Sequence, residues 1–182
     1  LRVASFTSSE IALAQREGMF SQIDLLALNE DEAATLAGRS FDPDDPEPLL
    51  KRCADVLRCS QPNIRIIITA GRHGAFAIAG DDWDYCPAPS VPVVSTAGAG
   101  DALVAGMLSA LALELPFMND GGRRRPRSLA TALDWGVLLA AYSVTSPHTI
   151  HPDADLEALF TFAGRLGLGL TEPVCEDAGN VR

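Results

Sequence analysis

The chain has 182 residues, of which 47% are hydrophobic and 21% are charged, and these values predict one globular domain rather than a disordered chain. Its formal net charge of −10 argues against a nucleic-acid partner, because phosphate contacts need clustered Lys and Arg. The sequence shows no signal peptide and no apolar run of the ~18 residues that cross a bilayer, which argues against a membrane partner. Its four cysteines form no C-x-x-C pair, so a reduced, cytoplasmic protein is expected.

Alternating strands and helices are predicted along the chain. In order, the sequence predicts a strand at 1–6, a helix at 8–18, a strand at 23–28, a helix at 30–38, a helix at 47–57, strands at 65–69 and 75–79, an irregular edge segment at 83–94, a helix at 101–113, a buried helix at 128–144 and a helix at 153–166. Ser8 or Ser9 is the expected N-cap of the first helix, and Asn29 is that of the second, which Gly38 ends. This alternation predicts a layered α/β/α fold with a mainly parallel sheet.

The most informative stretch is the small-residue turn 95–101, Ser-Thr-Ala-Gly-Ala-Gly-Asp, which lies between a strand-like segment and an apolar helix. Such a turn exposes successive backbone N–H groups, and the positive end of the helix dipole adds to them, so it is typical of a phosphate-binding site. A carboxylate beside this anion site is explained if Asp101 is a general base that takes a proton from an attacking hydroxyl. The alternative is that Asp101 only caps the helix or lies in its first turn.

Two other turns have structural interpretations of their own. Residues 69–74, Thr-Ala-Gly-Arg-His-Gly, lie between two predicted strands and are typical of a glycine-rich hairpin. Residues 29–32, Asn-Glu-Asp-Glu, are explained by helix capping, because Asn29 suits the N-cap and acids suit the positive end of the dipole. On this interpretation Glu30 and Asp31 are solvated acids of the first turn.

The small-residue turn and the helix start after it read S-T-A-G-A-G-D-A-L-V-A-G. This stretch resembles a signature of the ribokinase (PfkB-type) family of carbohydrate and nucleoside kinases, which reads roughly D-T-x-G-A-G-D-A-F-x-A-G. The resemblance implies that Asp101 is the catalytic base, with an anion hole formed by Gly98, Ala99 and Gly100. The family's leading Asp, which helps to shape a monovalent-cation site, is Ser95 here, so the resemblance gives no support for activation by potassium.

Two shorter motifs of the same family follow predicted strands. Asn29 and Glu32 match its N-x-x-E motif, which implies that Glu32, with Asn29, helps to hold Mg²⁺ through water. The turn at 69–74 matches T-x-G-x-x-G, which lies beside the nucleotide phosphates in the family. The nucleotide-binding residues that the resemblance implies are Thr69, Gly71 and Gly74 of this turn and Thr96 of the small-residue turn.

The resemblance implies a ribokinase-like fold and transfer of the γ-phosphoryl group of Mg-ATP to a hydroxyl of a sugar or nucleoside. Residues 1–170 are expected to be the C-terminal portion of such a kinase domain, without its N-terminal substrate and lid portion, and residues 171–182 a disordered tail. Pseudouridine, ribose, fructose and a keto-deoxy acid stay open as substrates, although segment 143–152 resembles the pseudouridine-kinase branch. The resemblance also allows a homodimer of the complete protein. The alternative is a non-catalytic nucleotide-binding remnant, or a half that needs the missing portion.

Overall fold

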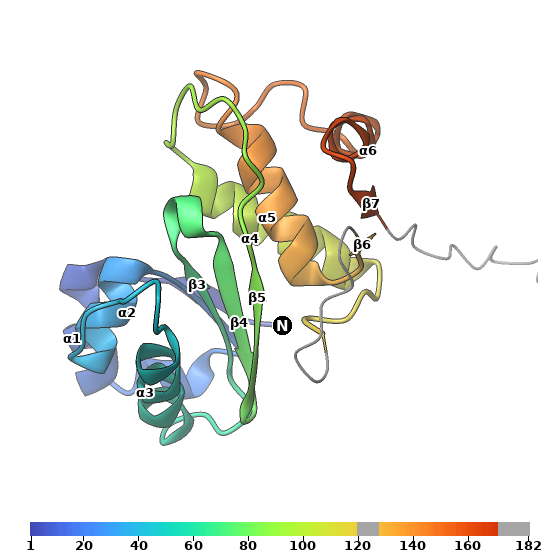
Figure 1. The fold of residues 1–182 in the computed structure, drawn as a ribbon. Coiled ribbons are helices and arrows are strands. Elements are labelled where there is room, and N and C mark those ends of the chain that lie inside the picture. The colour runs from blue at the N-terminus through green and yellow to red at the C-terminus, as the bar shows by residue number, and fades with distance from the viewer. Residues whose placement is uncertain (120–127, 171–182) are drawn as a thin grey trace, which may run out of the picture.

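A five-stranded sheet forms the centre of the protein (Figure 1). The computed structural model describes residues 1–119 and 128–170, so the expected tail at 171–182 lies outside the described residues. The strands follow one another across the sheet in chain order: β1 (Val3–Ser5), β2 (Leu25–Asn29), β3 (Arg65–Thr69), β4 (Ala75–Ala79) and β5 (Asp82–Cys86). β1, β2 and β3 are parallel, and β4 is antiparallel to both of its neighbours, so four of the five strands run in one direction. The expected α/β fold with a mainly parallel sheet is confirmed.

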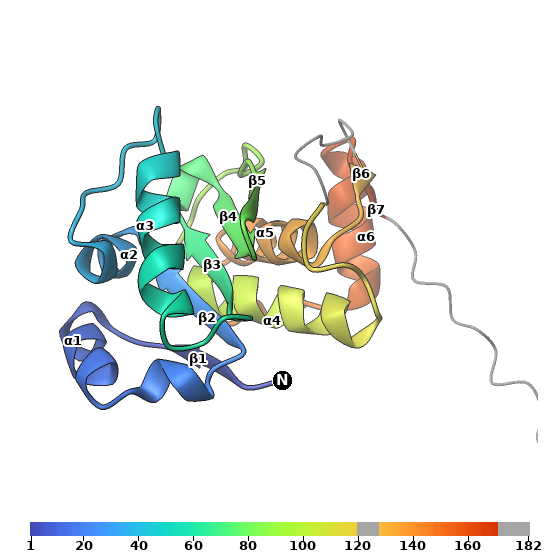
Figure 2. The same cartoon turned by 90° about the horizontal axis from the view of Figure 1, so that it is seen from below.

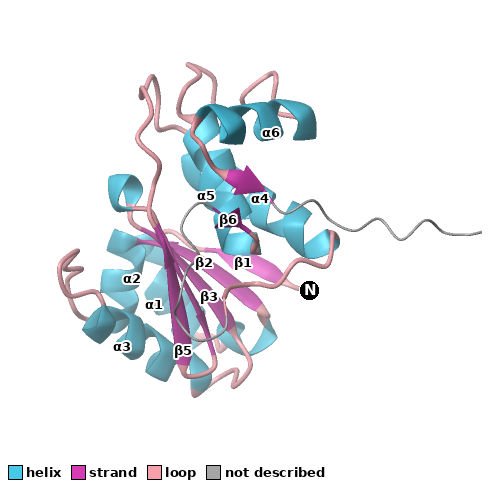
Figure 3. Ribbon diagram, turned by 45° about the vertical axis from the view of Figure 1, so that its right-hand side comes forward, coloured by secondary structure: helices cyan, strands magenta, loops and turns pink. Residues whose placement is uncertain are grey.

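Helices cover both faces of this sheet (Figures 2 and 3). One layer contains α1 (Ser8–Arg16), α2 (Glu30–Ala37) and α3 (Glu47–Arg58), with a 3-10 turn at Met19–Gln22. The other contains α4 (Ala99–Ala112) and α5 (Ala132–Ser143), with α6 (Leu156–Arg165) packed against α5 and a short parallel pair of strands, β6 (Ser128–Leu129) and β7 (Gly169–Leu170). A further 3-10 turn, Gly71–His73, joins β3 to β4.

The continuous apolar run of β2 explains why the sheet is covered twice. Successive side chains of a strand point to opposite faces, so Leu26 and Leu28 join the core beneath α1, α2 and α3. Leu25 joins the second core, which also contains Leu103 and Met107 of α4. Each face therefore has its own buried apolar cluster, as expected for a sheet strand without a polar side.

Several element boundaries differ from the predictions. The N-cap of α1 is Thr7 rather than Ser8 or Ser9, because its hydroxyl and the Glu10 carboxylate form a reciprocal capping box. Part of the expected irregular segment at 83–94 is the regular strand β5, which pairs with β4. The expected helix at 128–144 is instead a strand followed by α5, which begins after Thr131.

Helices α4 and α5 cross at two glycines. A Cβ added to Gly106 would lie 2.8 Å from the main-chain oxygen of Trp135. A Cβ added to Gly136 would lie 2.8 Å from the main-chain oxygen of Leu103. The two backbones therefore approach more closely than any side chain would allow, and this contact fixes α5 against the middle of α4.

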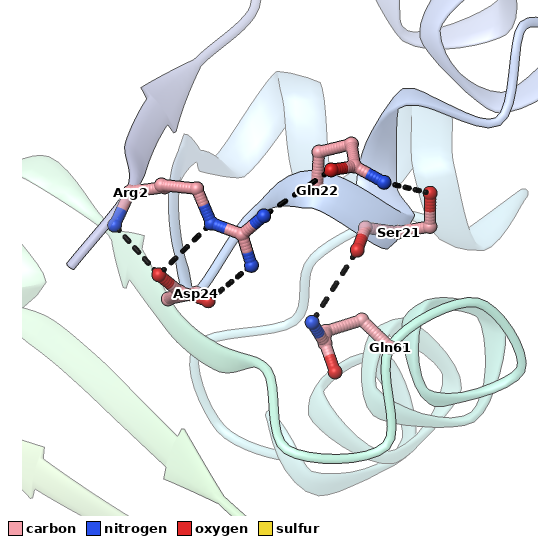
Figure 4. Close-up of polar contacts among 5 residues, drawn as sticks. All are labelled: Arg2, Ser21, Gln22, Asp24 and Gln61. Atoms are coloured by element: carbon pink, nitrogen blue, oxygen red, sulfur yellow. Dashed lines mark hydrogen bonds and ion pairs between the residues drawn. The ribbon is translucent and has the colours of Figure 1, made fainter.

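An ion pair ties the edge strand β1 to the start of β2 (Figure 4). The Arg2 guanidinium donates to both carboxylate oxygens of Asp24, at 2.8 and 3.2 Å, and the Arg2 main-chain N–H donates to the same carboxylate at 2.7 Å. These bonds from Arg2 lower the pKa of Asp24 to about 2. Next to them Arg2 donates to Gln22, and Gln61 donates to the main-chain oxygen of Ser21 (Figure 4).

No helix in the described part of the chain is long and apolar enough to span a membrane.

Candidate active site

A cavity of about 670 Å³ lies where β2 and β3 end and α4 begins. Ligands of α/β proteins commonly bind at such carboxyl ends of parallel strands. Most of the residues expected at the site line it, namely Asn29, Thr69, Gly71, Gly74, Thr96, Ala99 and Gly100. The lining does not include three of the expected residues, Gly98, Asp101 and Glu32. Each of them is the chain neighbour of a residue that does line the cavity.

The turn before α4 depends on Gly98. This residue has a φ of 79°, in the left-handed region that favours glycine, and it is the N-cap of α4. A Cβ at Gly98 would also collide with the main-chain oxygen of Thr149 and lie 2.7 Å from its Cγ2. On the other side, the amides of Val94 and Ser95 both donate to the carbonyl oxygen of Val144, at 2.8 and 3.2 Å. The turn is therefore held between α5 and the segment that follows it.

The first turn of α4 presents an open surface to the cavity. A Cβ added to Gly100 would have no described atom within 4 Å, so there is room for a ligand against the main chain. The Ala99 amide donates to the carbonyl oxygen of Thr96 at 3.2 Å, while the first intrahelical bond joins the Ala102 amide to Gly98 at 2.9 Å. The amides of Gly100 and Asp101 lie between them, in the part of a helix that lacks internal acceptors. They are the donors best placed for an anion in the cavity.

Asp101 differs from the corresponding acids of other helices. At the third position of α1, α2 and α5 stand Glu10, Glu32 and Asp134, and each accepts a hydrogen bond from the N-cap amide of its helix. Asp101 is at the same position in α4, but its exposed carboxylate makes no hydrogen bond with any described residue. Among the described residues Asp101 therefore has no capping partner, and its carboxylate lies next to the first-turn amides of α4.

Glu32 makes the capping contacts predicted from the sequence. Its amide donates to Asn29 Oδ1 and its Oε2 accepts from the Asn29 amide, both at 2.8 Å. The capping interpretation of these two residues is confirmed. The bond uses only Oε2, and Oε1 of Glu32 has no hydrogen bond within the described part of the chain. Residues 1–119 and 128–170 contain no ready-made group of three or more His, Cys, Asp or Glu that could hold a metal ion.

The structure adds charged residues that the sequence did not assign to the site. Glu30 and Asp31, expected to be solvated acids of a first turn, line the cavity. Arg72 also lines it and is the one cationic side chain of the described lining. The sequence did contain a signal for Arg72, because this residue lies inside the glycine-rich turn that follows β3 at the edge of the cavity.

The part of the cavity away from these charges is apolar. Its lining comes from the irregular segment before the α4 turn and from one side of α5, namely Val91, Val93, Val137, Ala140, Ala141 and Val144. Val137 is only 4% exposed, whereas Val93 is 63% exposed and leaves apolar surface uncovered. The cavity therefore has a polar end at the strand ends and an apolar end against α5.

Comparison with known proteins gives a family match over most of the chain. The family model described as "pfkB family carbohydrate kinase" matches residues 3–156. A probable fructokinase-7 of Arabidopsis thaliana is 26% identical over 160 residues, which cover 87% of this chain and 43% of that protein. A chloroplastic probable fructokinase-6 of the same plant is 30% identical over 125 residues, which cover 69% of this chain and 31% of that protein. The chain thus spans less than half the length of these relatives.

Solved structures show the same fold. A putative sugar kinase from Clostridium perfringens matches 87% of this chain and 45% of its own, with a TM-score of 0.68 and 20% identity. Aminoimidazole riboside kinase from Salmonella enterica, complexed with aminoimidazole riboside and an ATP analogue, matches 87% of this chain and 48% of its own, with a TM-score of 0.61 and 26% identity. Fructokinase from Vibrio cholerae, with fructose, ADP and calcium bound, matches 85% and 45%, with a TM-score of 0.64 and 23% identity.

Proposed function

Because this chain belongs to the pfkB family of carbohydrate kinases, we propose that it is the nucleotide-binding part of an enzyme that transfers the γ-phosphoryl group of ATP to a hydroxyl of a sugar or nucleoside. The observation that carries this proposal is the carboxylate of Asp101, which makes no hydrogen bond with any described residue and follows Gly100, a residue of the α4 N-terminus that lines the cavity. The alternative of a non-catalytic remnant has less support, since a carboxylate beside an anion site repels the ligand unless it takes part in the reaction.

The chain's own residues supply most of what phosphoryl transfer needs, which is positioning and neutralisation of charge. The amides of Gly100 and Asp101 bind the phosphate nearest to α4, and the dipole of that helix adds to the attraction. Arg72, the one cationic side chain of the described lining, neutralises charge on the phosphate chain. Asp101 takes the proton of the attacking hydroxyl through its carboxylate.

The donor set at the polar end suits Mg²⁺, which prefers carboxylate, carbonyl and water oxygens. Glu32 keeps one carboxylate oxygen outside its capping bond, so Glu32, with Asn29, would hold the ion through water, and Glu30 and Asp31 add negative charge to the same lining. When bound, the metal neutralises the phosphate charge that develops in the reaction. We propose no monovalent-cation site, because Ser95 brings no charge and its Oγ accepts from the Ala97 amide at 3.3 Å.

Fructose is the first substrate to test, because the matched relatives are named as probable fructokinases. Ribose and pseudouridine stay in the panel, since nothing in the described residues separates the three. The experiment measures ADP release from Mg-ATP with each candidate, using this chain alone and using the protein that contains it. Release that depends on one candidate identifies the substrate. Release only from the longer protein means that this chain is a half that needs the remainder.

Asp101→Asn tests the assignment of the base. The substitution keeps the size and the main chain of the α4 turn, so ATP affinity is expected to stay within about threefold of the wild type. Turnover is expected to fall by at least about 10²-fold, the lower limit for loss of a general base. Asp55→Asn, at an exposed position of α3 outside the cavity lining, controls for the loss of one negative charge. Wild-type turnover in Asp101→Asn would remove Asp101 from this role.

Glu32→Gln tests the metal assignment. Its amide oxygen can still accept the capping bond from Asn29, so stability is expected to change little. The magnesium concentration for half-maximal turnover is expected to rise, because a negatively charged oxygen ligand is lost. An unchanged magnesium titration would leave Glu32 with capping as its only role.

A further inference from the structure

The two ends of the cavity differ in the chemistry that they offer to a nucleotide. The charged side chains of the lining gather at the strand ends, namely Glu30, Asp31 and Arg72. The lining of the apolar end comes from valine and alanine side chains, four of them on α5 and the residue after it. If the phosphates lie against the start of α4, the base of the same nucleotide occupies the apolar end.

Purine bases are told apart by the hydrogen bonds of their edges. Adenine offers a donor where guanine offers an acceptor, so discrimination needs a protein group that can pair with only one of them. A site with such groups can reject the wrong ligand by 10⁴-fold or more, as an order of magnitude, whereas an apolar pocket separates similar ligands by only about 10- to 200-fold. The chemistry of the lining therefore decides how selective the site is.

The described side chains at the apolar end offer no group of that kind. Beyond the valines and alanines, the one polar side chain of the same lining segment is Ser90, which is exposed. A hydroxyl can donate or accept by rotating, so it pairs equally well with an amino or a keto substituent. Val93, 63% exposed, adds apolar surface that any flat ring can cover.

We propose that this site does not select adenine and that it accepts purine nucleoside triphosphates in general, GTP and ITP as well as ATP. The inference rests on the proposed phosphotransfer function and deepens it, by naming the class of phosphoryl donor. The base is held by contact with the apolar end, and the triphosphate by the polar end. Pyrimidine nucleotides bind less tightly because their single ring covers less of the apolar surface.

The first experiment is equilibrium binding to the protein that contains this chain, measured as displacement of fluorescent methylanthraniloyl-ATP. ATP, GTP and ITP are expected to displace the probe with affinities within about tenfold of one another, at the lower end of the separation that an apolar pocket gives. An affinity for ATP more than about 200-fold above that for GTP would overturn the proposal, because it exceeds what an apolar pocket gives and main-chain groups of residues 88–93 would then read the base.

Turnover separates this proposal from the one on which it rests. Comparable binding of the three purine nucleotides without phosphoryl transfer to any sugar or nucleoside would refute the kinase function. The proposed lack of selection among purine bases would still hold. Transfer from ATP alone, with GTP excluded, would keep the kinase function and refute the broad preference. If none of the three nucleotides displaces the probe, both proposals are refuted.

Two variants locate the base. Ala140→Phe fills the apolar end and is expected to weaken ATP and GTP together by at least about tenfold, while displacement by inorganic tripolyphosphate, which has no base, stays unchanged. Ala112→Phe, at an exposed position of α4 outside the cavity lining, is the matched control. Equal loss of tripolyphosphate binding in Ala140→Phe, or unchanged ATP binding, would contradict the proposal.

Val93→Ser covers the case in which Ala140→Phe does not fold. Val93 is exposed, so its replacement leaves both cores intact. Loss of its apolar contact is expected to weaken ATP and GTP by a similar factor of about three to ten. A change confined to one of the two nucleotides would show that this segment selects the base and would overturn the proposal.

Discussion

Replacing Gly98 by alanine tests how the turn before α4 is built. With a φ of 79°, the position is left-handed, and an L-residue there costs about 1–2 kcal/mol. The new Cβ would also collide with the main-chain oxygen of Thr149, which cannot rotate away as the end of a long side chain could. Crowding of this kind costs about 1–3 kcal/mol, so Gly98→Ala is expected to lower the free energy of unfolding by about 3 kcal/mol.

Gly100→Ala is the matched control two residues later. Its Cβ would meet no described atom within 4 Å, and alanine is favoured over glycine in a helix by up to ~1 kcal/mol. Stability is therefore expected to stay the same or to rise slightly. Because Gly100 lines the cavity, its methyl group takes the space next to the amides that we assign to phosphate, and nucleotide affinity is expected to fall. Gly98→Ala loses stability and affinity together, whereas Gly100→Ala loses affinity alone.

Urea unfolding measures the stability of both variants. Trp135, buried in the second core, reports unfolding by its fluorescence, and a loss of about 3 kcal/mol shifts the midpoint by about 1–3 M for a slope of about 1–3 kcal/mol per M. Displacement of methylanthraniloyl-ATP measures affinity in the same samples. An unchanged midpoint and slope for Gly98→Ala would refute the view that left-handed geometry and the contact with Thr149 hold this turn.

Two further predictions concern the edge strand and the helix crossing. In Arg2→Ala the pKa of Asp24 is expected to rise from about 2 toward its ordinary value, as a carboxyl NMR titration can show. Since the folded-state pKa of Asp24 is lowered, the pair with Arg2 stabilises the fold at neutral pH, and this contribution is lost as the pH falls toward about 2. The free energies of unfolding of wild type and Arg2→Ala should therefore converge in acid. A difference that stays constant with pH would contradict this. Gly136→Ala would place its Cβ 2.8 Å from the main-chain oxygen of Leu103. The free energy of unfolding in urea is expected to fall by about 1–2 kcal/mol, because the cost of overpacking exceeds the gain in helix propensity. An unchanged free energy of unfolding would mean that α4 and α5 are free to separate.

Features that depend on neighbouring residues were predictable from the sequence. The apolar run at 25–28 identified a doubly covered strand, because no polar side chain interrupts it. Asn29 and Gly38 marked both ends of α2, because an Asx cap and a left-handed glycine each act within one turn of the helix. The cap of α1 was wrong by one or two residues, because Thr7, Ser8 and Ser9 are chemically alike. Only the reach of Glu10 to the Thr7 amide decides among them.

Features that depend on distant segments were missed. β6 pairs with β7, about forty residues further along the chain. Without that partner in view, Ser128–Leu129 was predicted to be part of an apolar helix. The same limit applies to the site. The glycine-rich turns and Asp101 were visible as local motifs, but the apolar end requires α5 to cross α4 beside the 88–93 segment, which no local pattern predicts.

The role of Asp101 turns on a comparison that only the structure provides. An acid at the third position of a helix is ordinary, and in α2 and α5 it completes a capping box with an N-cap side chain. The N-cap of α4 is Gly98, which has no side chain to complete such a box, and Asp101 makes no capping bond within the described residues. A glycine at the N-cap and an acid left free therefore belong together. On the proposed function, the glycine lets the chain turn tightly enough to open the amides of α4 to an anion, and the same residue at the N-cap leaves the carboxylate available for proton transfer.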